Sequence, residues 1–308
     1  MAIKISDLVK RYGDRLVLDF FDMEVQDGEM FGLLGSDGAG KSTVIDCLLG
    51  QLPYDRGKIE IFSEELTKKN RKLKKKIGVV PQQLVLFGEL TVYENIDYFC
   101  SLYIMNQRER HQLVQEALES CDLCSVADAY PGKLSPSMCR RLNLACGIAH
   151  KPQLLILDEP LIGTDVLSRE TILGVFRHLH ALGVTMLYVS KDIEEMARLC
   201  TRIAIMDQGK VVITATTDEL KAIISVGEKV TIEVFRMKAD AVEEISAMKG
   251  VVFANYVNHE LVVKSEKGKN NLANVLHFLE DHKIPFGKVY SEVPMLKDVF
   301  WEITGREL

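Results

Sequence analysis

The sequence has no long run of apolar residues. None of its segments approaches the ~18 consecutive apolar residues that a membrane-spanning helix needs. The first residues, Met1–Ile5, pass directly into a strand pattern with no signal-peptide core. The net charge of −6 gives no reason to expect nucleic acid as a partner. These absences favour a cytosolic protein that does not bind nucleic acid.

Cysteine is sparse and shows no disulfide pattern. The seven cysteines are odd in number and scattered along the chain, which argues against a disulfide framework. Cys121 and Cys124 form a single C-x-x-C, and no second pair follows at the spacing of a zinc site. Buried thiols of a reduced protein are the simpler interpretation, with metal or redox use as the alternative.

What the sequence does have is length and apolar content. Its 308 residues, 47% of them hydrophobic, suffice for two domains or for one large and one small. The pattern changes near residue 226. We expect a first domain over residues 1–225 and a small α+β accessory domain over 226–308. The second segment shows no cluster of catalytic residue types, so we expect it to serve contacts rather than chemistry.

The strongest motif is a glycine-rich stretch that fits G-x-x-x-x-G-K-[ST]. A strand pattern leads into it and a helix pattern follows, as a phosphate-binding loop requires. Glycines let backbone N–H groups approach phosphates closely, and the positive end of the helix dipole faces them. Lys41 is expected to reach the β- and γ-phosphates and Ser42 to bind Mg²⁺. The alternative is a glycine-rich turn without a ligand. The stretch comprises Gly35, Ser36, Asp37, Gly38, Ala39, Gly40, Lys41, Ser42 and Thr43.

A second motif is an apolar strand that ends in two carboxylates. The run 153–157 is continuously apolar after Gln153, which is typical of a strand covered on both faces of a parallel sheet. Asp158 and Glu159 follow at its carboxyl end, where ligands gather in open α/β sheets. Asp158 can bind a hard divalent cation beside phosphates. Glu159 is placed to orient or deprotonate a water molecule.

The rest of the first domain alternates strands with a mainly helical insert. Residues 2–34 predict two or three strands, and further strands are expected at 58–62 and 184–190. The run 77–83 predicts a strand that ends at Pro81 and leads into a loop. A hairpin is expected around Asp207, Gln208 and Gly209. In the insert, about residues 88–150, Thr91–Glu94 reads as a capping box and Gln107–Ala127 as an amphipathic helix. The stripe Tyr93, Ile96, Phe99 and Tyr103 is most simply core.

In the second domain, strands are expected over 229–235 and 288–293 and a hairpin over 251–264. One helix is expected to be capped at Asp240, another to present the face Leu272, Val275, Leu276 and Leu279, and a last one to span 296–304.

Two segments have competing interpretations. Tyr12 follows the first strand and can stack on a flat base, or it can be a half-buried loop tyrosine. Lys68–Lys76 is strongly basic. It can contact anionic lipid headgroups, although a solvated helix face is the simpler interpretation.

Taken together, these motifs resemble the ATP-binding subunits of ABC transporters over residues 1 to about 220. The resemblance implies an α/β P-loop NTPase fold with a mixed-sheet core, an antiparallel β subdomain and a helical subdomain. It implies ATP and Mg²⁺ as cofactors, adenine stacking on Tyr12, and Mg²⁺ ligation by Ser42, Gln82 and Asp158. Ser135 stands in the signature motif. The catalytic residues that it implies are Gln82, Glu159, Asp165 and Lys191.

The resemblance also implies partners. In this family two cassettes close face to face, and each ATP lies between the phosphate loop of one and the signature of the other. Cytoplasmic loops of a transmembrane permease subunit dock on the helical insert. The tail 293–308 looks like that of exporter-type subunits. A cytoplasmic protein, peripheral on the inner face of the cell membrane, is therefore expected, as a homodimer or a heterodimer.

The signature motif and one further position depart from the family pattern. The signature, usually Leu-Ser-Gly-Gly-Gln, reads Leu134–Met138 with Pro136 and Ser137 in place of the glycines. Ser135 is a good N-cap and Pro136 suits the first helical position, but the N–H at 136 is lost, as is close backbone approach at 136 and 137. Lys191 replaces the usual histidine, and an ammonium can donate to phosphate but accepts nothing.

We therefore expect an exporter ATPase with slow turnover when the chain pairs with itself. One alternative is an ATP-binding clamp with little hydrolysis, active only as half of a heterodimer. Another is that substitutions elsewhere compensate fully for the altered signature and Lys191, so that turnover is normal. A soluble cassette acting on DNA or ribosomes is disfavoured by the single cassette, by the lack of a long coiled-coil insert and by the lack of an overall basic charge. A small-molecule kinase would leave residues 134–165 unexplained. Cargo is chosen by the membrane subunits.

Overall fold

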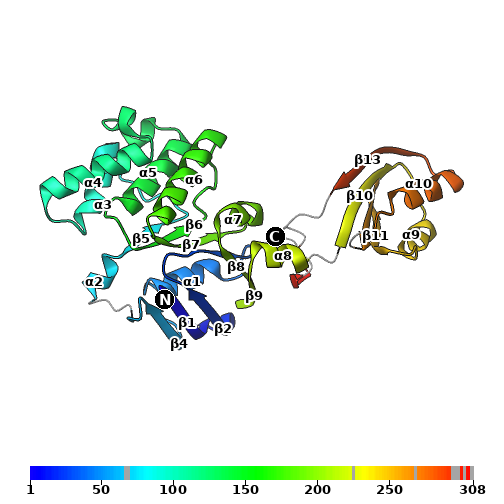
Figure 1. Cartoon of the computed structure of the whole chain (residues 1–308), viewed down its shortest axis with the longest axis horizontal. Helices are drawn as coiled ribbons and strands as arrows, with labels where there is room; N and C mark the ends of the chain where they lie inside the picture. Colours follow the sequence, from blue (N-terminus) through cyan, green and yellow to red (C-terminus); the bar gives the residue numbers. More distant parts are fainter. Residues whose placement is uncertain (66–69, 224–225, 267–268, 293–298, 301–302, 306–308) are drawn as a thin grey trace. The chain divides into compact units, whose positions relative to one another are not determined.

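The computed structural model describes residues 1–65, 70–223, 226–266, 269–292, 299–300 and 303–305. By its internal contacts the chain divides into two compact units, Met1–Thr217 and Asp218–Glu307. Figure 1 shows both units and labels most of their helices and strands. The boundary expected from the sequence lies slightly later, between residues 225 and 226.

A six-stranded sheet in the order β5-β6-β7-β3-β8-β9 forms the centre of the first unit. Neighbouring strands run parallel except for the hairpin of β8 and β9. The apolar strands β3, β6 and β7 are buried along nearly their whole length, as strands covered on both faces must be. The carboxyl ends of β3 and β6 lie at the same edge with β7 between them. The strands are β3 (Met30–Leu34), β5 (Ile77–Val80), β6 (Leu154–Asp158), β7 (Thr185–Ser190), β8 (Arg202–Asp207) and β9 (Lys210–Thr216).

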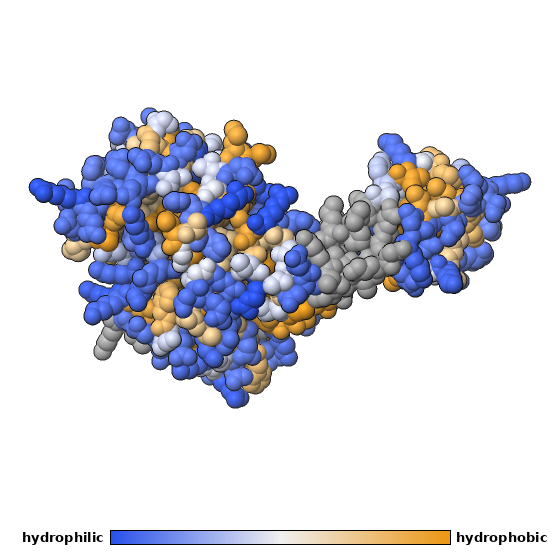
Figure 2. Space-filling view, viewed as in Figure 1, coloured by the Kyte–Doolittle hydropathy of each residue, from blue (hydrophilic) through white to orange (hydrophobic). Residues whose placement is uncertain are grey.

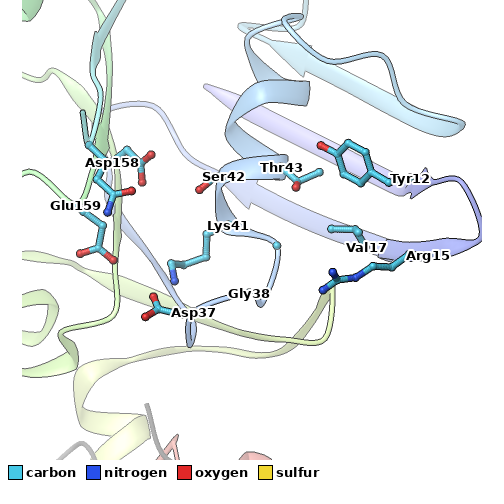
Figure 3. Close-up of a pocket in the computed structure, with 12 residues that line it drawn as sticks. Tyr12, Arg15, Val17, Asp37, Gly38, Lys41, Ser42, Thr43, Asp158 and Glu159 are labelled. Atoms are coloured by element: carbon cyan, nitrogen blue, oxygen red, sulfur yellow. The ribbon is translucent and has the colours of Figure 1, made fainter. Parts of the chain in front are cut away.

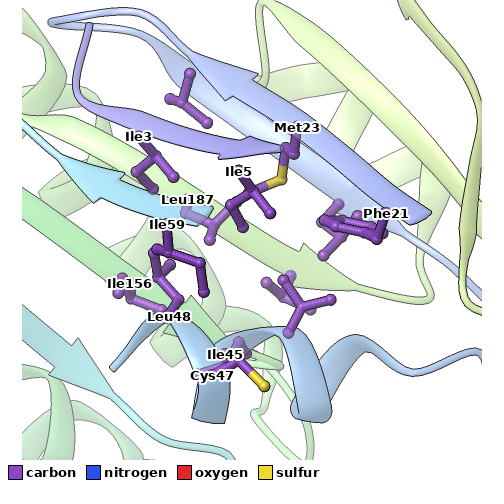
Figure 4. Close-up of a cluster of buried hydrophobic side chains, with 14 of the residues drawn as sticks. Ile3, Ile5, Phe21, Met23, Ile45, Cys47, Leu48, Ile59, Ile156 and Leu187 are labelled. Carbon is purple, nitrogen blue, oxygen red and sulfur yellow. The ribbon is translucent and has the colours of Figure 1, made fainter. Parts of the chain in front are cut away.

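A three-stranded antiparallel sheet, β2-β1-β4, packs beside this centre. Its strands are β1 (Ile3–Tyr12), β2 (Arg15–Val25) and β4 (Arg56–Ile61). Inward-facing side chains of this sheet form one apolar cluster with helix α1 (Lys41–Leu48) and with strands β6 and β7 (Figure 4). The helix that follows the glycine-rich loop is thus held on both sides by core packing. The labelled members include Ile5, Phe21, Leu48, Ile156 and Leu187.

The insert between β5 and β6 is helical, as expected. It contains α3 (Val92–Ser101), α4 (Gln107–Ser120) and α5 (Pro136–Ile148), with 3₁₀ turns at Cys124–Val126 and Pro131–Lys133. The capping box is confirmed: the Glu94 N–H donates to Thr91 Oγ1 at 3.2 Å, and the Thr91 N–H donates to Glu94 at 2.8 Å.

Two expectations for the insert are wrong in detail. The helix from Gln107 ends at Ser120, and the chain turns before the 3₁₀ segment instead of continuing to residue 127. In the aromatic stripe only Ile96 is fully buried. The rings instead pack at the margin of the core, as in the stacking of Tyr103 on His150, with centroids 4.0 Å apart.

Three further helices belong to the first unit. The basic segment contains α2 (Arg71–Lys74), where Leu73 is buried and its basic neighbours are exposed; Lys68 and Lys69 lie outside the described residues. α6 (Val166–Ala181) and α7 (Ile193–Leu199) follow β6 and β7. The segment after Asp158 and Glu159 continues into α6, and the segment after Lys191 continues into α7.

The second unit has the element order βαββαβ after helix α8 (Thr217–Ile223), with sheet order β11-β12-β10-β13, all antiparallel. Its core includes Val275 and Leu279, confirming the expected helical face. The first helix begins one residue before Asp240, and its N-cap is Lys238. Most of the expected last helix, 296–304, lies outside the described residues. The elements are β10 (Val226–Val234), α9 (Ala239–Ser246), β11 (Val251–Val257), β12 (Glu260–Glu266), α10 (Leu272–Asp281) and β13 (Phe286–Glu292).

Candidate functional site

The glycine-rich loop joins β3 to α1 with a backbone that few residues can adopt. Gly38 and Gly40 have φ values of +82° and +111°, in the region that side chains other than glycine rarely enter. At Gly35 a Cβ would lie 2.8 Å from the carbonyl oxygen of Met206. The glycines therefore specify a tight course that ends at a helix N-terminus, where anions bind.

Lys41 is the buried cation of this loop, with 8% of its surface exposed. Its ammonium group donates to the carbonyl oxygens of Gly35 at 2.6 Å and Ser36 at 3.0 Å. Burial lowers the pKa of Lys41, and the nearby Glu159 and Asp37 carboxylates oppose that shift. An ammonium group that bonds only loop carbonyls is ready to receive an anionic ligand.

The two carboxylates after β6 differ in environment. Burial raises the pKa of Asp158 to about 6, with a further contribution from Glu159. Burial also raises the pKa of Glu159, whose carboxylate accepts a hydrogen bond of 3.2 Å from Ser190 Oγ. Glu159 has φ of +46°, a strained value of the kind that collects at functional sites. Its N–H donates to the Val189 carbonyl at 2.8 Å, which holds this turn on β7.

These groups line one cavity of about 360 Å³. Figure 3 shows the carboxylates on one side, the loop in the middle, and Tyr12 with Arg15 at the other end. The lining therefore changes along the cavity, from acidic side chains at one end to a basic and an aromatic side chain at the other. Its lining residues are Tyr12, Arg15, Val17, Asp37, Gly38, Gly40, Lys41, Ser42, Thr43, Gln82, Asp158 and Glu159.

Arg15 and Val17 are lining residues that sequence reasoning missed. Tyr12 is the last residue of β1, not part of a loop, and it pairs directly with Arg15 across the hairpin. Its ring is half exposed, and Lys10 Nζ lies 5.2 Å from the ring centre. A two-residue turn at Gly13 and Asp14 would have indicated this pairing. The stacking role of Tyr12 stays a prediction.

Lys191 and Gln82 approach the loop from other strands. Lys191, just after β7, donates from Nζ to Asp37 Oδ2 at 3.1 Å, an exposed ion pair. Gln82 lines the cavity after β5. Lys191 thus contacts the glycine-rich loop and Gln82 lines the cavity, while their roles toward phosphate stay predictions.

The loop 81–91 after β5 is fastened by three side chains that sequence reasoning missed. Arg140 donates to the Gln82 carbonyl at 2.7 Å. Asn143 accepts from the Val85 N–H and donates to the Pro81 carbonyl, both at 3.2 Å. Asn95, with no exposed surface, accepts from the Phe87 N–H at 2.8 Å. Its amide nitrogen donates within 3.0 Å to the carbonyl oxygens of Phe87, Leu90 and Thr91.

Ser135 and Asp165 do not line the cavity. Ser135 is the N-cap of α5 and accepts from the Met138 N–H at 3.2 Å, as expected. Asp165 is the N-cap of α6 and accepts from the Ser168 N–H at 2.8 Å. Ser135 and Asp165 therefore lie at two helix N-termini, apart from the predicted residues that line the cavity.

The donor set fits Mg²⁺ beside phosphate, not a metal cage made of protein alone. Among the described residues, no group of three His, Cys, Asp or Glu side chains can hold a metal ion. Mg²⁺ commonly uses one or two carboxylates together with substrate phosphates, and Asp158 with the Ser42 hydroxyl supplies such a set in the cavity. The seven cysteines are free; five are buried, and Cys124 is exposed. Burial raises the pKa of Cys121 to about 12, which makes its thiol inert.

A glycine-rich loop that joins a parallel strand to a buried helix, with two carboxylates at the end of a nearby strand, defines a P-loop nucleoside triphosphatase. The family model described as "ABC transporter" matches residues 18–162. The linearmycin resistance ATP-binding protein LnrL of Bacillus subtilis (strain 168) is 32% identical over 313 residues, 99% of each chain. The chain belongs to the ABC transporter ATP-binding proteins and is an ATPase, as the resemblance implies.

Further relatives and solved structures agree. The Nod factor export ATP-binding protein I of Sinorhizobium fredii (strain NBRC 101917 / NGR234) is 33% identical over 319 residues, 100% of this chain and 87% of that protein. A dimeric ATP-binding cassette in a post-hydrolysis state bound to ADP and Pi has a TM-score of 0.63 at 25% identity, over 70% of this chain and 98% of that one. The cbiO1 protein from Clostridium perfringens, part of the complex cbiONQ, has a TM-score of 0.65 at 26% identity, over 72% and 90%. The expected ATP-binding fold is thereby confirmed.

Proposed function

We propose that this chain powers an exporter through a separate membrane subunit, and that it turns over slowly when it pairs with itself. Two relatives along nearly the whole chain, named for Nod factor export and for linearmycin resistance, support the export role. In this proposal residues 1–225 form the cassette, with the helical subdomain at about 88–150, and residues 226–308 form an accessory domain for contacts.

The cavity supports a specific division of roles. The loop 35–43 and Lys41 hold the phosphates of ATP, and Tyr12 stacks on the base. Mg²⁺, when bound, neutralises phosphate charge beside Ser42, Asp158 and Gln82. Glu159 orients or deprotonates the attacking water, and the hydrogen bond from Ser190 holds its carboxylate in one orientation.

The altered signature supports slow self-paired turnover. In the face-to-face dimer of the family, the N-terminus of α5 meets the ATP bound by the opposite cassette. Pro136 occupies the first position of α5 and has no N–H to offer. Loss of one charge-assisted donor weakens such a contact by about 1.5–3 kcal/mol, roughly ten- to a hundredfold. In a heterodimer, a partner cassette with two glycines in its signature would restore the site that holds the ATP bound by this chain's phosphate loop.

A clamp that binds ATP with little hydrolysis is the second candidate. The ion pair between Lys191 and Asp37 favours it. Lys191 stands where the family has a histidine, and its ammonium group can bond phosphate but cannot accept a proton or a hydrogen bond. It therefore holds ATP more readily than it assists hydrolysis. Asp165 in the loop before α6 completes the residues expected near the dimer face.

An exposed apolar surface supports docking of the permease. Its six side chains are each at least 39% exposed, and the rings of Phe87 and Tyr98 pack 4.8 Å apart. Asn95 and Asn143 hydrogen-bond backbone groups of this loop, which reduces the number of backbone groups that a docking partner would have to satisfy. We name it the loop–α3 surface; it consists of Leu84, Val85, Phe87, Tyr98, Leu102 and Met105. Apolar side chains also interrupt the hydrophilic surface in Figure 2.

ATP-binding subunits of this kind dimerise as cassettes and work with membrane components. No helix in the described part of this chain is long and apolar enough to cross a bilayer. Docking on the permease through the loop–α3 surface places the chain, in this proposal, on the inner face of the membrane.

The test is ATP turnover by the purified chain, alone and co-purified with its membrane subunit; a six-helix membrane protein encoded by the neighbouring gene would be the candidate for that subunit. Slow turnover that the membrane protein accelerates, and that Glu159→Gln abolishes, supports the motor. Tight ATP binding with turnover that stays negligible in both samples supports the clamp. Rates equal to those of an ordinary family member, for the chain alone, would refute the proposed slow turnover.

A further inference from the structure

Ser137 replaces a glycine of the signature, yet its side chain does not lie on the exposed face of that motif. Ser135 and Pro136 are exposed, whereas Ser137 is only 5% exposed. The hydroxyl is turned inward, toward the start of α6.

The hydroxyl contacts Asp165. The Asp165 N–H donates to Ser137 Oγ at 2.9 Å. The Asp165 carboxylate in turn accepts from the Ser168 N–H at 2.8 Å and from Ser168 Oγ at 3.3 Å. The Ser137 hydroxyl lowers the pKa of Asp165, with the Ser168 N–H as a second cause. One serine thus joins the first turn of α5 to the N-cap of α6.

We propose that Ser137 is a positioning residue that fastens Asp165 to the start of α5 within the same chain. The inference rests on the proposed function, in which both helix N-termini face the opposite cassette. A phosphate that binds at Ser135 then moves Asp165 with it, because the two N-termini are joined by this hydrogen bond. A glycine at position 137 has no group that makes this connection.

For one substitution at position 137, the expected change in turnover is opposite to the change that relief of a clash would produce. Ser137→Gly restores the residue of the family, so relief of a clash predicts faster turnover. If Ser137 positions Asp165, the same change lowers kcat, because the Asp165 N–H loses its acceptor. One neutral hydrogen bond corresponds to about a three- to tenfold decrease.

The experiment compares Ser137→Gly, Ser137→Ala and Ser137→Thr in the full-length chain. Ser120→Ala is the matched control, since Ser120 also bonds through its hydroxyl but at the end of α4. Steady-state kinetics separate kcat from the KM for ATP. Hydrogen exchange reports the Asp165 amide directly, and thermal melting verifies that every variant is folded.

The Gly and Ala variants should lose about three- to tenfold in kcat with KM changed by less than about twofold, and their Asp165 amide should exchange about three- to tenfold faster. The Thr variant, which keeps the hydroxyl, and the Ser120 control should match the parent. Unchanged or faster turnover in both Ser137→Gly and Ser137→Ala, or an unchanged Asp165 amide, overturns the inference. If the parent chain hydrolyses no ATP, the motor proposal fails, and exchange at Asp165 still decides the inference.

Discussion

Replacing Pro136 tests the link between the signature and turnover most directly. Pro136 is the first residue of α5, is exposed, and follows an N-cap that stays in place. Pro136→Ala restores a backbone N–H at the N-terminus of the helix. Pro136→Gly restores the N–H and also removes the Cβ. The pair therefore separates the missing donor from the obstruction by a side chain.

The expected magnitude follows from one charge-assisted hydrogen bond. Such a bond to phosphate contributes about 1.5–3 kcal/mol, so Pro136→Ala should raise turnover of the self-paired chain by roughly ten- to a hundredfold. Stability should change the other way. Loss of a proline that fits its position costs about 0.4–1 kcal/mol, and glycine costs about 1 kcal/mol more than alanine within a helix. For the unit Met1–Thr217, each kcal/mol lowers Tm by about 2–4 °C.

The assay is phosphate release at saturating Mg·ATP, with Tm measured on the same preparations. Pro136→Gly should be faster and less heat-stable than the parent. If both substitutions leave turnover unchanged while the protein remains folded, the missing N–H does not limit the reaction and the account of the signature is wrong. An increase for Gly but not for Ala would assign the effect to the Cβ.

Four further predictions follow from the site. Lys41→Ala should weaken Mg·ATP binding at least tenfold, because the buried ammonium group is the cation of the loop; calorimetry measures it. Glu159→Gln should lower kcat by about 10²–10⁴ while ATP binding persists, as single-turnover assays would reveal. Burial raises the pKa of Glu195 to about 7, against the pull of Arg169, so the folded state keeps a proton that the unfolded state releases. The unfolding free energy should therefore fall by up to about 3 kcal/mol as pH rises from ~4.5 to ~7, and Glu195→Gln should flatten that slope in urea titrations. Asn143→Ala should lower the unfolding free energy by about 2 kcal/mol, since two backbone groups of the loop 81–91 lose their partner, and urea titration at one pH measures this.

The strands and the phosphate-binding loop could be predicted from the sequence, because each is specified by residues close together along the chain. The run that ends at Asp158 is continuously apolar, and only a strand buried on both faces needs that. The glycine-rich loop was predictable because its backbone demands glycine at Gly38 and Gly40. The capping box at Thr91 was predictable for the same reason, since its two hydrogen bonds join residues three apart.

Contacts between distant segments were not predictable in this way. The inward turn of Ser137 depends on Asp165, and residue type alone says nothing of which side of α5 a serine occupies. Likewise Asn143 and Arg140 look like ordinary helix residues until α5 packs beside the loop after β5. Arg15 enters the cavity only through its pairing with Tyr12 across the hairpin.

Asn95 and Asn143 have a consequence for how such proteins diversify. They hold the backbone of the loop 81–91, so its shape does not depend on the side chains it displays. Leu84, Val85 and Phe87 are thus free to change identity over evolutionary time while the nucleotide cavity keeps its geometry. If the loop–α3 surface binds the membrane subunit as proposed, a few substitutions there would change the partner and leave the nucleotide cavity unaltered.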